Sequence, residues 1–365
     1  MLRNLADITA RMYRICTGMF KRNKQSNPHY VYVTNQGSNS ISQYVISAHG
    51  RLAPMLTATI AAGTTPVFIA VSPSARHAYV VNQGGNSISQ YRISANGSLD
   101  VIAAPAAAGT SPVEIAIAPS GRFAYVVNSS SNDVSQYLVG ENGMLAAMSP
   151  ATIETGMIPV AVAVTPSGKY VYVVNNSSND ISQYAVAENG SLVAMHPPTI
   201  AAGAAPRAIA IDPSGKNIYV ANRSSCNISQ YAITSNGSLS PVSTPVAAGK
   251  HPIFISITPS GKYAYVANQN SNNISQYTLT ENGSLMPMTP ATIASAATPV
   301  CIAVARSEKY AYVTNISSNN ISQYAIGQQG ELCAIPMNAW GDATIAAEVS
   351  PRCVTAIDMH NAAAR

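Results

Sequence analysis

Five side chains with useful chemistry stand at two neighbouring positions of a chain that otherwise repeats itself. Glu114 carries a carboxyl group that could act as a general base. Arg207 and Arg352 each follow a proline, and the planar fork of a guanidinium group suits carboxylate or phosphate. Cys301 and Cys353 supply two thiols, which by themselves are too few for a zinc site. These residue types indicate the binding of a small anion, with or without attack by water.

The repeat that carries these residues is marked by the segment Ile-Ser-Gln-Tyr. Successive copies start 46 or 47 residues apart, and Val134–Tyr137 is an edited copy that completes a set of seven. A fixed period in this range is the mark of a repeat architecture. The six unedited copies occupy residues 41–44, 88–91, 181–184, 228–231, 274–277 and 321–324.

Each copy has the pattern of four short strands separated by tight turns. In one copy, an apolar run between prolines is followed by a segment rich in aromatic and β-branched residues, then by an alternating segment and a weaker outer one. Dipeptides such as Asn142-Gly143 supply the hairpin turns. The strands expected in this copy are 112–119, 123–128, 134–139 and 144–153. Four antiparallel strands in a repeat of this length form the blade of a β-propeller.

The seven copies therefore predict an all-β fold, a seven-bladed β-propeller of four-stranded antiparallel blades. The first copy opens at its second strand, Tyr30–Asn35, whereas the chain ends with a segment, Ser350–Asp358, that matches a first strand. We expect this C-terminal strand to complete the first blade and close the ring, which removes the open edges of the array. An insertion at residues 329–347 should bulge from the outer strand of the seventh copy.

The N-terminal segment differs from the repeats. Residues 1–28 combine apolar residues spaced by three or four with a basic face, so we expect a short amphipathic helix and a linker there. All of the net charge of +5 lies in residues 1–27, which hold six basic side chains and one acidic side chain. The expected domains are the helix and linker at 1–28, the propeller at 29–358 and a tail at 359–365.

The charge distribution limits the classes of partner. The residues after the N-terminal segment hold 14 basic and 14 acidic side chains, and a neutral body gives no long-range field to attract nucleic acid. The N-terminal helix either docks on the body or contacts a membrane surface or a partner protein. We otherwise expect a monomer whose partner is a protein or a small anionic ligand.

The cysteines and the apolar segments limit the cellular compartments in which we expect the protein. Five cysteines without a CxxC pair argue against a disulfide framework or a zinc cluster, so we expect a reduced chain with neither metal nor cofactor. The sequence has no apolar run of about 18 residues, as a membrane span would need. Its N-terminus lacks the apolar core of a secretory signal. We expect a cytoplasmic protein, with export by a non-standard route left open.

Residues present in every copy are expected to be structural. The asparagine that ends each second strand can satisfy backbone groups of nearby loops. The Ser-Gln-Tyr segment is expected to connect blades, with the tyrosine ring packed and its hydroxyl hydrogen-bonded. Function should therefore lie where the repeat is broken. In the connecting loops, such departures are Arg223, Cys226, Lys250 and His251.

Short motifs connect the repeats with a known family. Tyr32-Val33-Thr34-Asn35 and the segment 312–315 spell YVTN, and Pro-Ser-Gly-Lys precedes three of the variant copies, at 166–169, 213–216 and 259–262. On these motifs, residues 29–358 resemble the YVTN repeat proteins and the lactonase, or 6-phosphogluconolactonase-like, seven-bladed propellers. The resemblance implies the propeller fold. Some members of this group hydrolyse sugar lactones, and others are surface or binding proteins.

The resemblance also points to an inner strand. Enzymes of this group carry a Pro-Arg-His motif there, and the matching stretch is Pro206-Arg207-Ala208, with the arginine present and the histidine absent. The equivalent third positions of the other copies hold no histidine either: they are Phe68, Glu114, Ala161, Phe254, Cys301 and Cys353. We expect the histidines to lie in loops or at strand ends; they are His29, His49, His77, His196, His251 and His360.

The candidate site is therefore one mouth of the central channel, with Arg207, Arg352 and Glu114 as ligand-binding residues. The other five copies place Val or Ile where the arginines stand. A second interpretation is that each arginine only caps loop carbonyls or pairs with Asp212, Asp358 or Glu114. For function, the sequence puts a non-enzymatic interaction or ligand-binding scaffold first. The alternative is a lactonase-like hydrolase of a small anionic sugar lactone, in which Arg207 binds the anion and Glu114 is the general base.

Overall fold

The computed structural model describes residues 29–336 and 343–358 of the chain. The expected N-terminal helix, the tail from 359 and part of the insertion in the seventh copy lie outside the described residues. The described residues form thirty strands, β1–β30, joined by turns. None of them forms a helix that is long and apolar enough to cross a membrane.

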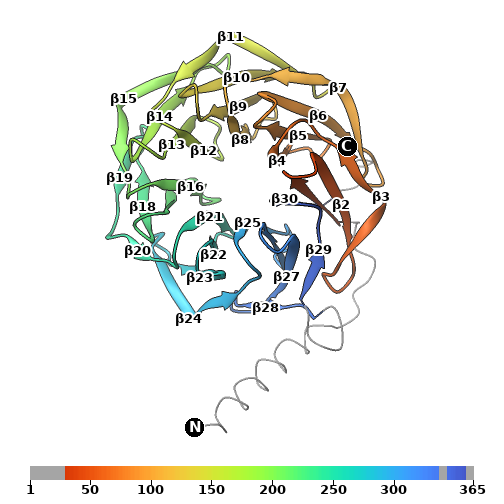
Figure 1. Cartoon of the computed structure of the whole chain (residues 1–365). Coiled ribbons are helices and arrows are strands. Elements are labelled where there is room, and N and C mark those ends of the chain that lie inside the picture. The colour runs from red at the N-terminus through yellow and green to blue at the C-terminus, as the bar shows by residue number, and fades with distance from the viewer. Residues whose placement is uncertain (1–28, 337–342, 359–365) are drawn as a thin grey trace, which may run out of the picture.

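The strands form seven antiparallel sheets arranged around a central opening (Figure 1). We number the sheets as blades 1 to 7 along the chain, starting with the sheet that contains β1. The inner strands of blades 1 to 7 are, in that order, β30 (Pro351–Asp358), β4 (Pro66–Val71), β8 (Pro112–Ile117), β12 (Pro159–Val164), β16 (Pro206–Ile211), β21 (Pro252–Ile257) and β25 (Pro299–Val304).

The second and third strands lie between the inner and outer strands of each blade. The second strands are β1 (His29–Asn35), β5 (His77–Asn82), β9 (Phe123–Asn128), β13 (Tyr170–Asn175), β17 (Asn217–Asn222), β22 (Tyr263–Asn268) and β26 (Tyr310–Asn315). The third strands are β2 (Ser40–Ile46), β6 (Ser87–Ile93), β10 (Asp133–Val139), β14 (Asp180–Val186), β18 (Asn227–Ile233), β23 (Asn273–Leu279) and β27 (Asn320–Ile326).

The outer strands are less regular than the repeat predicts. Five are continuous: β3 (Leu52–Ala61), β7 (Leu99–Ala107), β11 (Leu145–Glu154), β15 (Leu192–Ala201) and β24 (Leu285–Ala294). In blade 5 the outer strand is divided into β19 (Leu239–Pro241) and β20 (Val246–Ala247). In blade 7 it is divided into β28 (Leu332–Ala334) and β29 (Thr344–Ala346), which both lie within the segment 329–347 predicted as an insertion.

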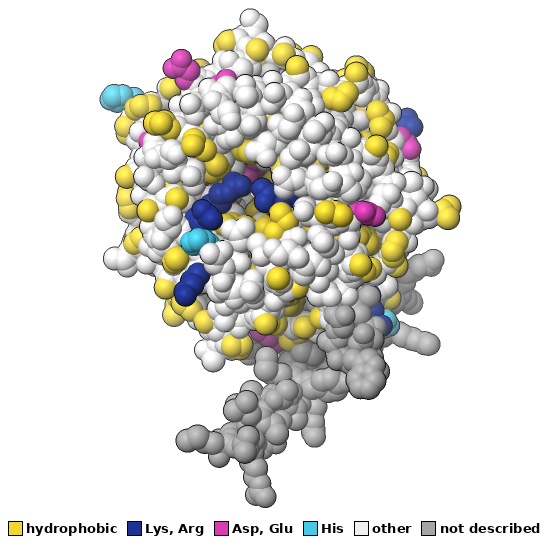
Figure 2. All heavy atoms as spheres, viewed as in Figure 1, with side chains coloured by type: hydrophobic (Ala, Val, Ile, Leu, Met, Phe, Trp, Pro, Cys, Tyr) yellow, Lys and Arg dark blue, Asp and Glu magenta, His cyan; other side chains and the backbone are white. Residues whose placement is uncertain are grey.

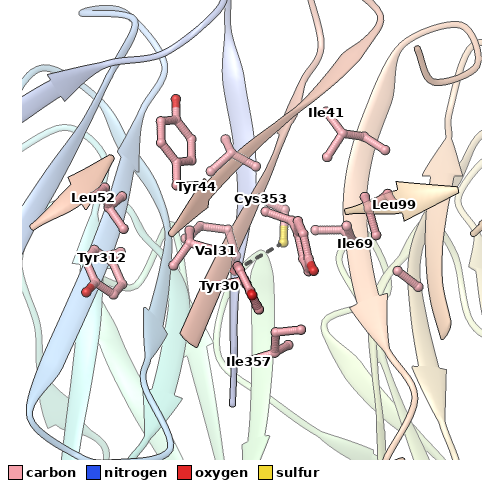
Figure 3. Packing of buried hydrophobic residues seen from close by; sticks show 14 of the residues in the cluster. Tyr30, Val31, Ile41, Tyr44, Leu52, Ile69, Leu99, Tyr312, Cys353 and Ile357 are labelled. Carbon is pink, nitrogen blue, oxygen red and sulfur yellow. Dashed lines mark hydrogen bonds between the residues drawn. The ribbon is translucent and has the colours of Figure 1, made fainter. Parts of the chain in front are cut away.

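The C-terminal strand closes the ring, as the sequence predicts. β30 pairs antiparallel with β1 and completes a sheet of order β3-β2-β1-β30, so blade 1 contains both ends of the propeller (Figure 1). Around this closure, Cys353 packs in a buried cluster with Tyr312 of blade 7 on one side and Ile69 of blade 2 on the other (Figure 3). Closure leaves no inner strand without a neighbour on each side, which protects the ring against pairing with other chains.

Burial explains why the middle strands are so apolar. All six residues of β9 are buried, because blades pack face to face around the ring and cover both sides of the middle strands. Outer strands such as β11 face solvent and are mostly exposed. The hydrophobic core is therefore a series of clusters between neighbouring blades.

The tyrosines and glutamines of the repeat connect blades, as predicted. The Tyr172 hydroxyl donates to the carbonyl of Gly237 in the next blade, 2.6 Å away, and the Tyr184 hydroxyl donates to the carbonyl of Glu154 in the preceding blade, 2.6 Å away. Gln183 Oε1 accepts a hydrogen bond from the Leu239 N–H, at 2.7 Å. The same contacts recur around the ring, including the closing seam, where Tyr312 donates to Gly50 and Gln323 accepts from Leu52.

The repeated asparagines are also structural. Asn222 Nδ2 donates to Ser229 Oγ and Asn227 Oδ1, 2.9 and 2.8 Å away, and its Oδ1 accepts from the Gly203 N–H at 3.1 Å. The asparagine therefore ties its own hairpin to the loop that leads into the blade. In Asn222 both side-chain atoms are satisfied, which stabilises the blade. In Asn35 and Asn128 the buried Oδ1 atom has no hydrogen-bond partner among the described residues, and the Nδ2 atom alone makes these contacts.

Candidate functional site

The site residues stand where each inner strand begins, at an irregular point of the sheet. In β16, Pro206 pairs with Asn222 and Ala208 with Ala221, so Arg207 lies at a shift in the strand register. The same shift follows the first proline in β8, just before Glu114. Such bulges re-aim side chains and are common beside functional sites. Here they place the second and third residues of the inner strands at one end of the channel.

The two arginines and the glutamate come together in one cavity of about 80 Å³. Cys301 and Cys353 line the same cavity. The rest of the wall consists of Val67, Phe68, Gln83, Val113, Val160, Ile253, Phe254 and Val300. Figure 2 shows this end of the channel as a hollow with Lys and Arg side chains gathered at its edge. The cavity is therefore apolar except for one acid, two cations, the two thiols and one amide.

Among the described residues, Arg207 is held by one hydrogen bond to the backbone. Its Nη1 donates to the Val160 carbonyl of blade 4, at 3.3 Å, and its side chain is partly buried. Burial and the neighbouring charge of Arg352 lower the pKa of Arg207 to about 10, Glu114 opposes this decrease, and Arg223 adds to it. The guanidinium stays protonated at neutral pH, with donors left over for a ligand.

The guanidinium group of Arg352 has fewer protein partners than that of Arg207. Among the described residues, no hydrogen-bond acceptor or carboxylate pairs with its guanidinium group, which is partly buried in the cavity wall. Burial lowers its pKa, while the neighbouring thiols of Cys353 and Cys301 act in the opposite direction. Two cations that repel each other in one partly buried cavity are stabilised by an anion that lies between them.

Glu114 is the acid of the cavity. Burial raises the pKa of this carboxyl group to about 8, although the charge of Arg207 and a hydrogen bond with the backbone of Val162 both lower it. The group is thus largely protonated at neutral pH and ionises slightly above it. A base with a pKa close to the working pH is well suited to proton transfer, because it is both available and strong enough.

The other proposed partners of the arginines are occupied elsewhere. Asp212 accepts hydrogen bonds from the backbone N–H groups of Lys216 and Asn217, at 2.9 and 3.2 Å. Asp358 pairs with His29. The prediction that an arginine caps a carbonyl is confirmed for Arg207 alone. The prediction that either arginine pairs with Asp212 or Asp358 is wrong.

None of the five described histidines lines this cavity. His29 and His77 begin strands, and His49 and His251 lie in turns and loops, as predicted. The prediction is wrong for His196, which lies inside the outer strand β15. Within the described part of the chain, no group of three or more His, Cys, Asp and Glu side chains is arranged to hold a metal ion.

Sequence reasoning missed the boundary of the cavity. Phe68, Phe254 and Cys353 line the mouth cavity and also a second, mostly apolar cavity of about 620 Å³ further along the channel. They therefore lie at the boundary between the two cavities. The sequence shows that Phe68 and Phe254 occupy equivalent positions, but it does not show that their rings point into the channel.

A second missed feature is the seam between blades 5 and 6. In the other six blades an asparagine oxygen accepts from an N–H of the next connecting loop; for example, Asn179 Oδ1 lies 2.7 Å from the Ala205 nitrogen. Cys226 stands at this place in blade 5, so its seam lacks the contact. Arg223 and His251 flank the same seam. The repeat already marks Cys226 as a departure, but it does not show which hydrogen bond the cysteine removes.

Solved structures with the same fold include proteins described as sugar lactonases. A candidate 6-phosphogluconolactonase from Bacteroides fragilis NCTC 9343 has a TM-score of 0.78 and 19% identity, and it covers 93% of this chain and 100% of its own. A second, from Bacteroides uniformis ATCC 8492, has a TM-score of 0.78 and 20% identity over 91% and 100% of the two chains. The periplasmic gluconolactonase of Pseudomonas aeruginosa has a TM-score of 0.75 and 19% identity over 91% and 100%.

At these identities, the solved structures support the fold alone. No protein with a curated description matches this sequence at a significant level. The family model described as "Lactonase, 7-bladed beta-propeller" matches residues 25–154, 144–254, 193–303 and 251–343, which together span most of the chain. With its seven four-stranded blades, its closing C-terminal strand and this match, the chain belongs to the seven-bladed β-propeller lactonase family.

Proposed function

We propose that this protein hydrolyses a small anionic sugar lactone at the mouth cavity. The observation that carries the proposal is that Glu114, Arg207 and Arg352 line one cavity although they come from blades 3, 5 and 1. Membership of the lactonase family supports it, as do the names of the solved structures with the same fold. The sequence alone put a non-enzymatic scaffold first, and the comparisons favour the hydrolase instead.

The arginines bind the anionic group of the substrate. A cavity of about 80 Å³ has room for several water molecules, and it therefore accepts a carboxylate or phosphate group. The lactone ring then lies above the cavity, in the open mouth. Arg352 has no protein partner among the described residues, and Arg207 keeps donors free beside its bond with Val160.

Glu114 acts as the general base. In its ionised form it takes a proton from a water molecule as the water oxygen attacks the lactone carbonyl carbon. The tetrahedral intermediate then collapses, the ring C–O bond breaks, and the departing oxygen receives the proton from Glu114. The product is a hydroxy acid, and the carboxylate is restored for the next cycle.

The proposal is tested by hydrolysis of a panel of sugar lactones at pH 7, phosphorylated and unphosphorylated, with the rate in buffer subtracted. We expect turnover of at least one anionic lactone, and a decrease of about 10²-fold or more in Glu114→Gln. Arg207→Ala should mainly raise KM. Matched controls are Glu141→Gln in an exposed turn of blade 3 and Arg51→Ala in an exposed turn of blade 1.

Two results would contradict the hydrolase. One is that no lactone of the panel reacts faster than it does in buffer. The other is that Glu114→Gln keeps the full rate. An anion that binds and depends on the two arginines, without any turnover, would restore the ligand-binding scaffold as the better interpretation.

A further inference from the structure

The thiols of Cys301 and Cys353 form a pair that the proposed hydrolysis does not use. The two sulfur atoms lie 3.4 Å apart, and the side chains are 2% and 3% exposed. Both residues occupy the third position of an inner strand, Cys301 in β25 of blade 7 and Cys353 in β30 of blade 1. The equivalent positions of the other blades hold phenylalanine, alanine or glutamate, so the repeat itself does not require a thiol there.

The pair spans the seam at which the ring closes. β25 and β30 are adjacent inner strands, and β30 is the segment that completes blade 1 from the far end of the chain (Figure 1). The Val354 N–H donates to Cys301 Sγ at 3.4 Å, so the backbone of the closing strand already holds this sulfur in place. A covalent bond here would fasten the closing strand to blade 7.

We propose that Cys301 and Cys353 are an oxidisable pair, which hydrogen peroxide converts into a disulfide that locks the closing seam of the propeller. The sulfur atoms need about 1.4 Å of approach to reach the disulfide bond length of about 2.05 Å. This inference stands apart from the proposed hydrolysis, because it concerns residues that the hydrolysis leaves unchanged.

The mouth cavity gives the oxidant a route to the thiols. Cys301 and Cys353 both line it, and its volume of about 80 Å³ admits a molecule the size of peroxide, since water occupies only about 30 Å³. The positive charge of Arg352 lies close to both sulfurs. Burial raises the pKa of Cys353, and the neighbouring Cys301 raises it further, so Cys353 stays the protonated partner.

The reaction balances with peroxide as the oxidant. The Cys301 thiolate attacks one oxygen, an S–O bond forms, the O–O bond breaks, and the hydroxide that leaves takes a proton to become water. The Cys353 sulfur then attacks the sulfenic acid on Cys301. The S–S bond forms, the S–O bond breaks, and the hydroxyl group leaves with the Cys353 proton as a second water molecule. Two thiols lose two electrons, and one peroxide gains them.

The experiment uses the full-length protein. Reduced protein is treated with hydrogen peroxide in modest excess, and peptide mapping by mass spectrometry locates any cross-link. We expect a peptide pair joined through Cys301 and Cys353, a loss of two hydrogen masses that dithiothreitol reverses, and a rise in Tm of about 3–8 °C. Oxidised glutathione is far larger than the cavity and should not give the cross-link in the folded protein.

Alanine variants provide the controls. Ala161 and Ala208 occupy the same repeat position in blades 4 and 5, so Cys301→Ala and Cys353→Ala place in blades 7 and 1 a residue that the fold already accepts there. Each should abolish the oxidative rise in Tm, whereas Cys226→Ala should keep it. The proposal fails if wild-type protein forms no cross-link between these two residues, if they oxidise separately to sulfinic acids, or if the cross-linked protein melts at the temperature of the reduced protein.

Discussion

His29 Nδ1 is hydrogen-bonded to the carboxylate of Asp358, although the two residues are 329 positions apart. The pair stands where the first strand of the ring, β1, runs beside the last strand, β30, at one end of the ladder that joins them. Because no turn connects these strands, their pairing depends on the side chains and backbone groups of the seam. The last described strand of the chain is thus as much a part of blade 1 as the first.

Removal of β30 should therefore open the ring. We expect a protein that lacks residues 349–365 to lose cooperative thermal unfolding and to aggregate, because blade 1 loses its inner strand and two sheet edges become exposed. Removal of residues 359–365 alone keeps the whole of β30 and is the control. Light scattering and calorimetry measure both properties. A shorter protein that stays monomeric with an unchanged Tm would show that β30 is dispensable.

Gly190 should tolerate substitution less well than Gly121. Both have positive φ, +88° and +71°, so alanine at either position costs about 1–2 kcal/mol of backbone strain. A Cβ at Gly190 would also lie 2.2 Å from the Phe123 ring of the preceding blade, whereas the nearest atom to a Cβ at Gly121 is 4.0 Å away. We expect Gly190→Ala to cost a further 1–3 kcal/mol or so of the free energy of unfolding.

Chemical unfolding of the two glycine variants measures the difference. If Gly121→Ala and Gly190→Ala lower the free energy of unfolding by the same amount, the close approach of Gly190 to the Phe123 ring contributes nothing to the difference.

Glu114 should make stability depend on pH. Its folded-state pKa of about 8 lies above the ordinary value of 4.5, so the stability linked to its protonated form is complete below pH 4.5 and is lost as pH rises through 8. Glu114→Gln keeps a neutral side chain at all pH values. We therefore expect the variant to gain stability relative to wild type between pH 5 and 9, measured by urea unfolding. Parallel pH profiles for the two proteins would place the carboxyl pKa near its ordinary value.

An anion should stabilise the protein through the two arginines. At saturating 6-phosphogluconate we expect Tm to rise by a few degrees, since a ligand at about 100 times its Kd adds about 2.7 kcal/mol. The rise should shrink above pH 8, where Glu114 ionises and repels the ligand. Arg207→Ala with Arg352→Ala should abolish it. Arg51→Ala with Arg122→Ala, both in exposed turns, removes the same charge and should not. A full shift in the first double variant would place the ligand elsewhere.

Most of the fold follows from the sequence because the period and the turn residues recur in every copy with few changes. The spacing of Ile-Ser-Gln-Tyr fixes the number of blades, and the missing and spare strands at the two ends fix the closure. The repeat register also predicts that Arg207 and Arg352 stand at equivalent places near the channel. These conclusions need only the order of residues along the chain.

The remaining features depend on contacts between blades, which a repeat pattern does not contain. That the Phe68 and Phe254 rings share a wall, and that Arg207 contacts the Val160 carbonyl, follow from the radius of the ring and the direction of each bulge. The divided outer strand of blade 5 and the exposed place of His196 in β15 also arise where packing is weak and the outer strand faces solvent.

Phe68, Phe254 and Cys353 lie between the mouth cavity and the second cavity, which is lined by the inner strands of the same seven blades. The three side chains narrow the channel at this point. We therefore expect a substrate to reach the arginines from the mouth and its product to leave on the same side. The product must then depart before the next substrate arrives, and the two compete for the same approach.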